Sequence, residues 1–141
     1  MLEKIKQMLL TFSYVTTGVI FAEAIFITVF LPDTLFTVSM LWETVGTSFI
    51  CVLGNLFYHS KYELSKKQII VRMVLHYIYI NIVVFGVGNV FQWRIVDSIQ
   101  MILLMIFLIA VVFIAVSVIM WTGSKKTSEL LNRQLKEYQE S

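Results

Sequence analysis

SKKQIIVRMVLHYIYIN, residues 65–81, is the stretch that decides the fold of this chain. Ser65 followed three residues later by Gln68 is the spacing of a capping box, in which each side chain bonds the other residue's backbone N–H. Two lysines follow the cap, and an apolar run with few polar side chains comes next. Arg72 and His76 are four residues apart within it, so they share one face of a helix. The pattern indicates the basic entry to a membrane-spanning helix.

The rest of the chain has the same apolar character. Of its 141 residues, 58% are hydrophobic and only 14% are charged, whereas a soluble domain carries about 25% charged residues. The apolar residues form four runs, each near the ~20 residues that a helix needs to cross ~30 Å of hydrocarbon. The runs do not alternate as the ~10-residue strands of a membrane barrel do. The sequence therefore predicts an all-α integral membrane protein with four transmembrane helices in an antiparallel bundle.

Turn and cap residues set the expected helix ends within this transmembrane domain, residues 1–121. Pro32 and Asp33 end the first helix, and Asp33 or Thr34 caps the second. Asp97 with Gln100 repeats the capping-box spacing before the fourth helix. Because the first connection is very short, the first two helices are expected to be antiparallel neighbours. The four expected helices span about residues 9–31, 35–58, 66–91 and 97–121.

The last segment, residues 122–141, is polar and is expected to form a short amphipathic cytoplasmic helix. A glycine and a serine at 123–124 are expected to act as a hinge or a cap before it. Leu131, Leu135 and Tyr138 recur at helical spacing and form one apolar stripe. A helix of about 16 residues with so narrow a stripe is marginal alone. It should therefore pair with a second copy, with the loop before the third helix, or with a cytoplasmic partner; the alternative is a solvated extension of the fourth helix.

The distribution of basic residues predicts the orientation. If the N-terminus is cytoplasmic, only Arg94 of the eleven Lys and Arg residues lies outside. That arrangement obeys the positive-inside rule, and the opposite one violates it. Both termini and the loop at 59–65 are therefore expected to be cytoplasmic. The ten basic residues on or near that side are Lys4, Lys6, Lys61, Lys66, Lys67, Arg72, Lys125, Lys126, Arg133 and Lys136.

Two acidic residues, Glu23 and Glu43, lie within apolar runs. The short turn between their helices places both carboxyls at a similar depth, with Asn81 of the third helix near the same level. A charge at that depth costs a few kcal/mol, and two carboxyls close together in low dielectric leave one of them protonated. The functional interpretation is a proton-sensitive or cation-binding site. The structural interpretation is a hydrogen-bonded cluster that fixes helix packing or a subunit contact.

A second polar layer is expected near the cytoplasmic ends of the second and third helices. It consists of Asn55, His59, Arg72 and His76. Arg72 is expected to reach lipid phosphates, and His76 to bond a neighbouring helix. Metal binding is disfavoured, because two histidines without a nearby cysteine or carboxylate do not complete a site.

No pattern in the sequence indicates an enzyme. It contains no G-x-S-x-G, no H-E-x-x-H, no P-loop and no Cys/His set. We therefore expect no catalytic, cofactor or metal site. The single cysteine, Cys51, excludes an intrachain disulfide. The net charge of +2 is too small to indicate direct nucleic-acid binding.

Three segments carry a resemblance to a known family: LSKKQIIVRMVLHYIYIN, GNVFQWRIVDSIQ and KKTSELLNRQLKEY. They resemble the four-span bacterial membrane proteins of domain of unknown function 3021. The best-matching positions are Arg72 to His76, Trp93, and Asn132 to Lys136. The resemblance covers the second half of the chain well, and the first half only by architecture. Glu23 and Glu43 match nothing in the family pattern.

The resemblance implies a function in transcription regulation. Members of that family are paired with LytTR-type DNA-binding regulators, and some restrain the regulator from the bacterial inner membrane. The expected partners are then a LytTR-type regulator and the lipid bilayer, and the sequence leaves a homodimer open. The expected contact surface combines the basic loop and the tail stripe: Lys61, Lys66, Lys67, Leu131, Leu135 and Tyr138.

The rival interpretation is a small proton-coupled transporter that uses Glu23 and Glu43. The segment FAEAIF, residues 21–26, resembles the first helix of the small multidrug-resistance transporters. Two features oppose it: the strong charge bias between the two sides, and the polar tail. A drug-dependent proton flux that requires Glu23 would favour this interpretation.

Overall fold

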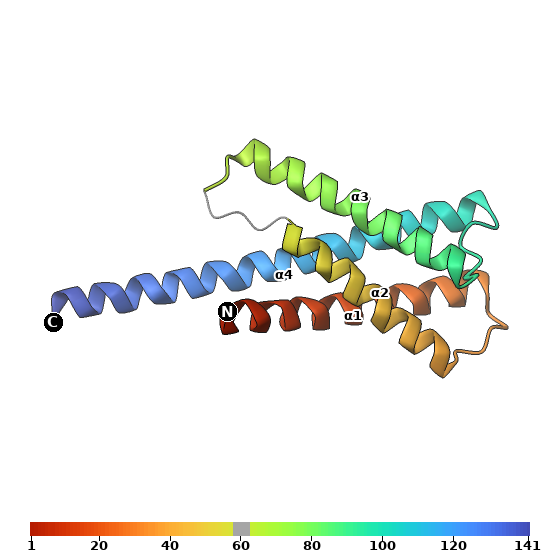
Figure 1. Ribbon diagram of the computed structural model, residues 1–141, viewed down its shortest axis with the longest axis horizontal. Coiled ribbons are helices and arrows are strands. Elements are labelled where there is room, and N and C mark those ends of the chain that lie inside the picture. Colours follow the sequence, from red (N-terminus) through yellow and green to blue (C-terminus); the bar gives the residue numbers. More distant parts are fainter. Residues whose placement is uncertain (58–62) are drawn as a thin grey trace.

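The computed structural model describes residues 1–57 and 63–141, which form four α-helices. The helices run alternately in opposite directions, and each contacts its two neighbours in a ring (Figure 1). Within the described residues, the diagonal pairs of helices do not meet. We call the end with the connections 31–37 and 91–98 the loop end, and the opposite end the terminal end. The helices are α1 (Leu2–Phe30), α2 (Val38–Phe57), α3 (Lys66–Val90) and α4 (Ile99–Glu140).

The membrane character of the fold is confirmed for three of the four helices. Among the described residues, α1, α3 and α4 are long and apolar enough to cross a bilayer. The second helix does not meet the same criterion, because the face that it turns inward is polar. Thr44, Thr47 and Ser48 of that face are almost completely buried. The all-α prediction holds, and the fold itself shows three candidate spans.

The helix start predicted at Ser65 is confirmed. The Ser65 hydroxyl accepts the backbone N–H of Gln68 at 3.3 Å, and the Gln68 side chain accepts the N–H of Ser65 at 3.1 Å. Both halves of the capping box are therefore present. Reciprocal caps of this kind satisfy two of the backbone donors that a helix start leaves unpaired.

The other three predicted starts differ from the structure. The second helix begins at Val38 and not at 35, because Thr37 supplies the cap and accepts the N–H of Met40 at 3.3 Å. The fourth begins at Ile99, with Ser98 as its N-cap. Asp97 does not cap it, because its carboxylate pairs with Arg94 at 2.7 Å. The first helix also begins earlier than predicted, at Leu2 and not at residue 9.

The prediction of a separate short C-terminal helix was wrong. The fourth helix continues for 42 residues, through positions 123–124, to Glu140. Glycine inside a helix costs only about 1 kcal/mol relative to alanine, and the good helix formers on both sides outweigh that cost. At 1.5 Å per residue this helix is roughly 60 Å long, about twice the hydrocarbon thickness. Figure 1 shows it projecting well beyond the start of α1. We call residues 122–140 the α4 extension.

The core lies toward the loop end. Its most deeply buried apolar side chain is Ile95, 2% exposed, which follows the sharp turn after α3. A Cβ on Gly88 would come within 2.5 Å of Ile95, so only glycine allows this turn to pack onto the helix. Phe26, Cys51 and further residues from all four helices surround it. Packing is therefore tightest at the end where two connections close the bundle.

Two tyrosines of α3 fix that helix between its neighbours. Tyr77 donates to the carbonyl of Ile106 on α4 at 3.0 Å, and Tyr79 donates to the carbonyl of Ile50 on α2 at 2.9 Å. The Tyr79 ring also packs closely against Gly54, because a Cβ on Gly54 would come within 2.4 Å of a ring atom. Hydrogen bonds between helices and close approach at small residues are the usual means of helix association in a membrane.

Candidate functional site

A cavity of about 690 Å³ lies inside the ring of helices. Residues of all four helices line it, from Glu23 and Trp93 near the loop end to Lys4 and Gln7 near the terminal end. Toward the terminal end α3 diverges from α4 (Figure 1). The volume lies within the ~300–1,000 Å³ of typical small-molecule sites. The ring therefore encloses space that could hold a ligand.

Glu23 binds to α2 through a chain of hydrogen bonds. Its two carboxyl oxygens lie 2.6 and 2.7 Å from the Thr44 hydroxyl, which lies 2.8 Å from the Met40 carbonyl oxygen. The hydroxyl has one proton to donate. If Glu23 is protonated, it can donate to Thr44 through one oxygen while Thr44 donates to Met40, so two of the three close contacts become hydrogen bonds. An ionised Glu23 would compete with the carbonyl for the same proton.

The two hydrogen-bond partners of the Glu43 side chain are both donors. The Trp93 indole N–H donates to one carboxylate oxygen at 2.6 Å, and the Ser39 hydroxyl donates to the other at 3.0 Å. An indole N–H can only donate, so Glu43 must accept there. Trp93 and Ser39 thus hold Glu43 as an acceptor, whereas Glu23 contacts a hydroxyl that also lies against a backbone carbonyl. We call Glu23, Ser39, Glu43, Thr44 and Trp93 the loop-end cluster.

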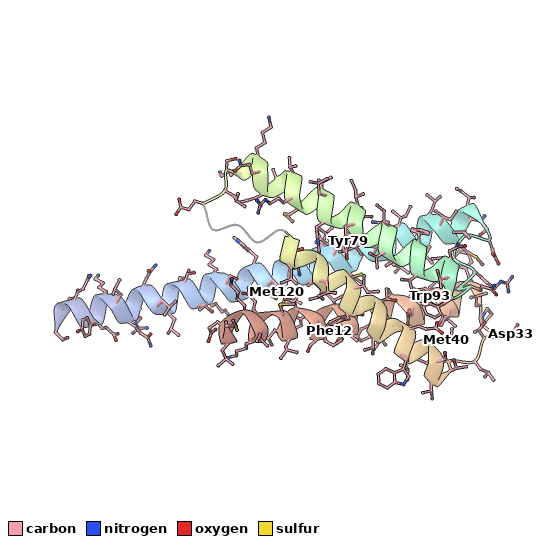
Figure 2. The ribbon with its side chains drawn as sticks, in the orientation of Figure 1. Phe12, Asp33, Met40, Tyr79, Trp93 and Met120 are labelled. Carbon is pink, nitrogen blue, oxygen red and sulfur yellow. The ribbon has the colours of Figure 1, made fainter. Side chains whose placement is uncertain are left out.

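Trp93 reaches Glu43 because of the local backbone between α3 and α4. The residues on both sides of it, Gln92 and Arg94, have left-handed φ values of 57° and 60°. Its backbone N–H donates to the Gly88 carbonyl at 2.8 Å, which holds the turn against the end of α3. Figure 2 shows Trp93 and Met40 toward the end of the bundle that carries Asp33. The connection therefore places an indole donor over the start of α2.

Sequence analysis named Trp93 only for the family resemblance and did not predict its bond to Glu43. Tryptophan enrichment at interfaces carries no information about which helix the indole will contact. Thr44 was also missed, because a threonine in an apolar run is ordinary. Its position next to Glu43, on the helix facing Glu23, is a signal that could have indicated it.

Asn81 does not join the two acidic residues. Its amide donates to the Tyr77 carbonyl of its own helix at 2.8 Å. Its Oδ1 atom is buried and has no hydrogen-bond partner among the described residues. The structure thus brings Glu23 of α1 onto Thr44, the residue next to Glu43 on α2, and leaves Asn81 bonded within its own helix, α3.

The second predicted layer is partly assembled along the cavity. Asn55 and His76 both line it. The His76 ring stacks near Tyr79, with centroids 6.0 Å apart, and near Phe113 at 5.8 Å. Arg72 is half-buried one turn earlier on α3, and His59 lies outside the described residues. In the described ranges no group of three His, Cys, Asp or Glu could hold a metal ion.

The predicted contact residues of the tail are exposed. Leu131 is 59% exposed, Leu135 57% and Tyr138 81%. Lys66 and Lys67 are exposed in the first turn of α3, at the same end of the bundle. Lys61 lies outside the described residues. The structure therefore leaves the stripe free of contacts with the rest of the described chain.

Comparison with known families, curated proteins and solved structures finds no match for this chain. Its function is therefore argued from the arrangement of its own residues.

Proposed function

We propose that this chain is a membrane-embedded regulator that binds and restrains a LytTR-type transcription factor at the cytoplasmic face of a bacterial inner membrane. The observation that carries the proposal is the α4 extension. It continues a membrane-spanning helix without interruption and presents an exposed apolar stripe. A rigid extension holds a soluble partner at a fixed distance from the bilayer, as a tether or anchor must.

The proposal includes four spans, with α2 as the fourth. The outward face of α2 carries large exposed apolar side chains, which lipid would cover: Leu41, Trp42, Phe49 and Ile50. Its buried hydroxyl residues face inward, where Thr44 bonds Glu23 of α1 and Thr47 donates to the Glu43 carbonyl of its own helix. A polar face is acceptable in a membrane when it is turned toward the bundle interior.

The orientation in this proposal has both termini in the cytoplasm. In the structure both termini lie toward the same end (Figure 1). At the loop end the charge of Arg94 is paired with Asp97 at 2.7 Å. The basic residues that remain unbalanced are concentrated at the terminal end, which is the side that the positive-inside rule assigns to the cytoplasm. A cytosolic partner can then reach the extension.

The test is co-purification of the regulator with stripe variants of the full-length protein. We expect Leu131→Asp and Leu135→Asp to reduce retention of the regulator at least ten-fold, because a buried unpaired carboxylate costs several kcal/mol. Leu130→Asp is the matched control. Leu130 is 58% exposed but lies about 100° away from Leu131 around the helix.

The outcome that would contradict the proposal is equal retention by Leu131→Asp and Leu130→Asp. If a LytTR-type reading frame adjoins the one for this chain, its product is the regulator to use. Its DNA binding, measured with and without membranes containing this protein, gives the second readout. Unchanged DNA binding in both conditions would remove the restraining function even if the two proteins associate.

One observation favours a second candidate, a small proton-coupled transporter. Glu23 lines the cavity within a membrane span, which is where a coupling carboxyl is expected. In vesicles containing the purified protein, this candidate predicts a drug-dependent proton flux that Glu23→Gln abolishes. Flux equal to that of protein-free vesicles would exclude it.

A further inference from the structure

We propose that the central cavity binds a single-chain anionic amphiphile of the fatty-acid class. Its carboxylate would lie at the terminal end beside Lys4, and its hydrocarbon chain would extend between α1 and α4 toward the loop end. This site goes beyond the regulatory function proposed above and does not depend on it.

The walls of the cavity suit a hydrocarbon chain. Between its two ends, the lining is formed mainly by aliphatic side chains of α1, α3 and α4. Burying apolar surface against such walls contributes about 25 cal/mol per Å². The aliphatic residues that line this middle part are Val15, Val19, Ile80, Val84, Ile109 and Val112.

The polar groups at the loop end of the cavity already have partners. Glu23 bonds Thr44, Trp93 bonds Glu43, and Thr47 donates to the backbone carbonyl of Glu43 at 2.7 Å. The Glu23 carboxyl is engaged by Thr44, and the Trp93 indole carries no charge. This end therefore offers no unpaired group that would select a cation, and it can accept the end of an apolar chain.

The polar groups at the terminal end are available. Lys4, Gln7 and Asn55 line the cavity there, and all three are exposed. Among the described residues no hydrogen bond or ion pair engages their side chains; the Gln7 backbone carbonyl accepts the Thr11 hydroxyl at 2.9 Å. They offer an ammonium group and two amides, which together match a carboxylate. We call these three residues the mouth of the cavity.

The charges along the cavity select an anion at the mouth. Of the described residues that line the cavity, Glu23 alone is acidic. Along α1, Glu23 lies about 28 Å from Lys4 by helical rise, so it does not offset the lysine charge. A cationic amphiphile would place its charge either beside Lys4, which repels it, or beside the Glu23 carboxyl, which is already hydrogen-bonded to Thr44. An anionic head group at Lys4 with an extended chain avoids both the repulsion and the competition for Glu23.

Trp93 provides the probe for the experiment, because it lines the loop end of the cavity. The other two tryptophans, Trp42 and Trp121, are exposed and are replaced by Phe. Full-length protein in phosphatidylcholine nanodiscs is titrated with a long-chain fatty acid brominated near its methyl end. We expect saturable quenching of Trp93 fluorescence, because bromine quenches only at contact. Nanodiscs made with chain-brominated phosphatidylcholine should leave most of that fluorescence intact.

Variants at the mouth locate the head group. Lys4→Gln should weaken fatty-acid binding roughly five-fold, the amount expected from losing one partly solvated ion pair. Lys6→Gln removes the same charge from the same helix, but Lys6 does not line the cavity. The Lys6→Gln protein should therefore bind the fatty acid with the affinity of the parent. Both substitutions are at exposed positions, and folding is checked by circular dichroism.

Three results would overturn the proposal. The first is quenching that rises linearly with fatty-acid concentration and does not saturate. Quenching of the same extent in nanodiscs of brominated phosphatidylcholine would have the same meaning. The second is equal affinity for the Lys4→Gln and Lys6→Gln proteins. The third is a competition result. If a long-chain alkylamine displaces the brominated fatty acid at a lower concentration than the unbrominated acid needs, the cavity prefers cations.

Discussion

The hydrogen bonds of the loop-end cluster differ for its two carboxyls, and this difference is testable one residue at a time. If Glu23 is protonated and donates to Thr44, then Glu23→Gln keeps a neutral donor in the same place. We expect its free energy of unfolding to stay within about 0.5 kcal/mol of the parent. Thr44→Val leaves the Glu23 proton without an acceptor and should cost about 1–3 kcal/mol.

These stabilities are measured by thermal unfolding of the purified protein in detergent micelles, followed by circular dichroism. Thr28→Val is the matched control, because the Thr28 hydroxyl is exposed and bonds only the Ala24 carbonyl of its own helix. It should change stability little. A Glu23→Gln protein as unstable as the Thr44→Val protein would show that Glu23 is ionised in the folded state.

Two glycines of α2 give a second prediction at this scale. A Cβ on Gly54 would come within 2.4 Å of the Tyr79 ring, which is fixed by its own hydrogen bond to Ile50. Gly54→Ala should therefore destabilise the protein by about 1–3 kcal/mol. A Cβ on Gly46 meets nothing within 4 Å. Gly46→Ala should stabilise it by up to about 1 kcal/mol through helix propensity, and the opposite order in melting temperature would contradict this packing.

The sequence identified the two intramembrane acids but not their partners. Depth can be counted from helix ends, and this placed Glu23 and Glu43 at one level. The direction of each side chain depends on helix rotation, which an apolar run does not specify, because every face is hydrophobic. Asn81 was grouped with them by depth alone, and the structure turns its amide back to Tyr77.

Among the elements, the continuity of α4 is the feature with the clearest consequence. Spin labels at Thr122→Cys and Gln139→Cys, in a Cys51→Ser background, should be about 26 Å apart if the helix is unbroken. Double electron–electron resonance should then give one narrow distance distribution. A hinge at 123–124 would give a broad distribution shifted to shorter distances. Gly123→Pro supplies the broken-helix reference, because proline disrupts the helix interior.

Helix existence was predictable, and helix ends were predictable only where the local signal was unambiguous. The Ser65 box involves two side chains that have no competing partner, and it formed as predicted. Asp97 had the same spacing to Gln100, but Arg94 lay closer and took its carboxylate. Ser98 then capped the helix. Capping patterns therefore fail where an ion pair offers the cap residue an alternative.

For the whole molecule, the ring arrangement and its cavity could not be read from the sequence. Hydropathy gives the number and order of the helices, and short connections make neighbours antiparallel. The cavity comes from tight packing at the loop end combined with the divergence of α3 at the other end (Figure 1). That combination depends on a few close contacts, such as Gly88 with Ile95, whose pairing is not encoded in any local pattern.

Sidedness is the property of the whole molecule on which the regulatory proposal depends, and cysteine labelling tests it. In a Cys51→Ser background, Ser141→Cys should react with a membrane-impermeant maleimide only in inverted vesicles, and Thr34→Cys at the loop end only in intact cells. The reason is electrostatic: translocating the terminal end would move most of the Lys and Arg residues across the bilayer, whereas at the loop end Arg94 is paired with Asp97. Labelling of Ser141→Cys from outside intact cells would place the α4 extension and the mouth of the cavity in the periplasm. A cytosolic transcription factor could then reach neither, and the regulatory proposal would fail even if the fatty-acid site remained.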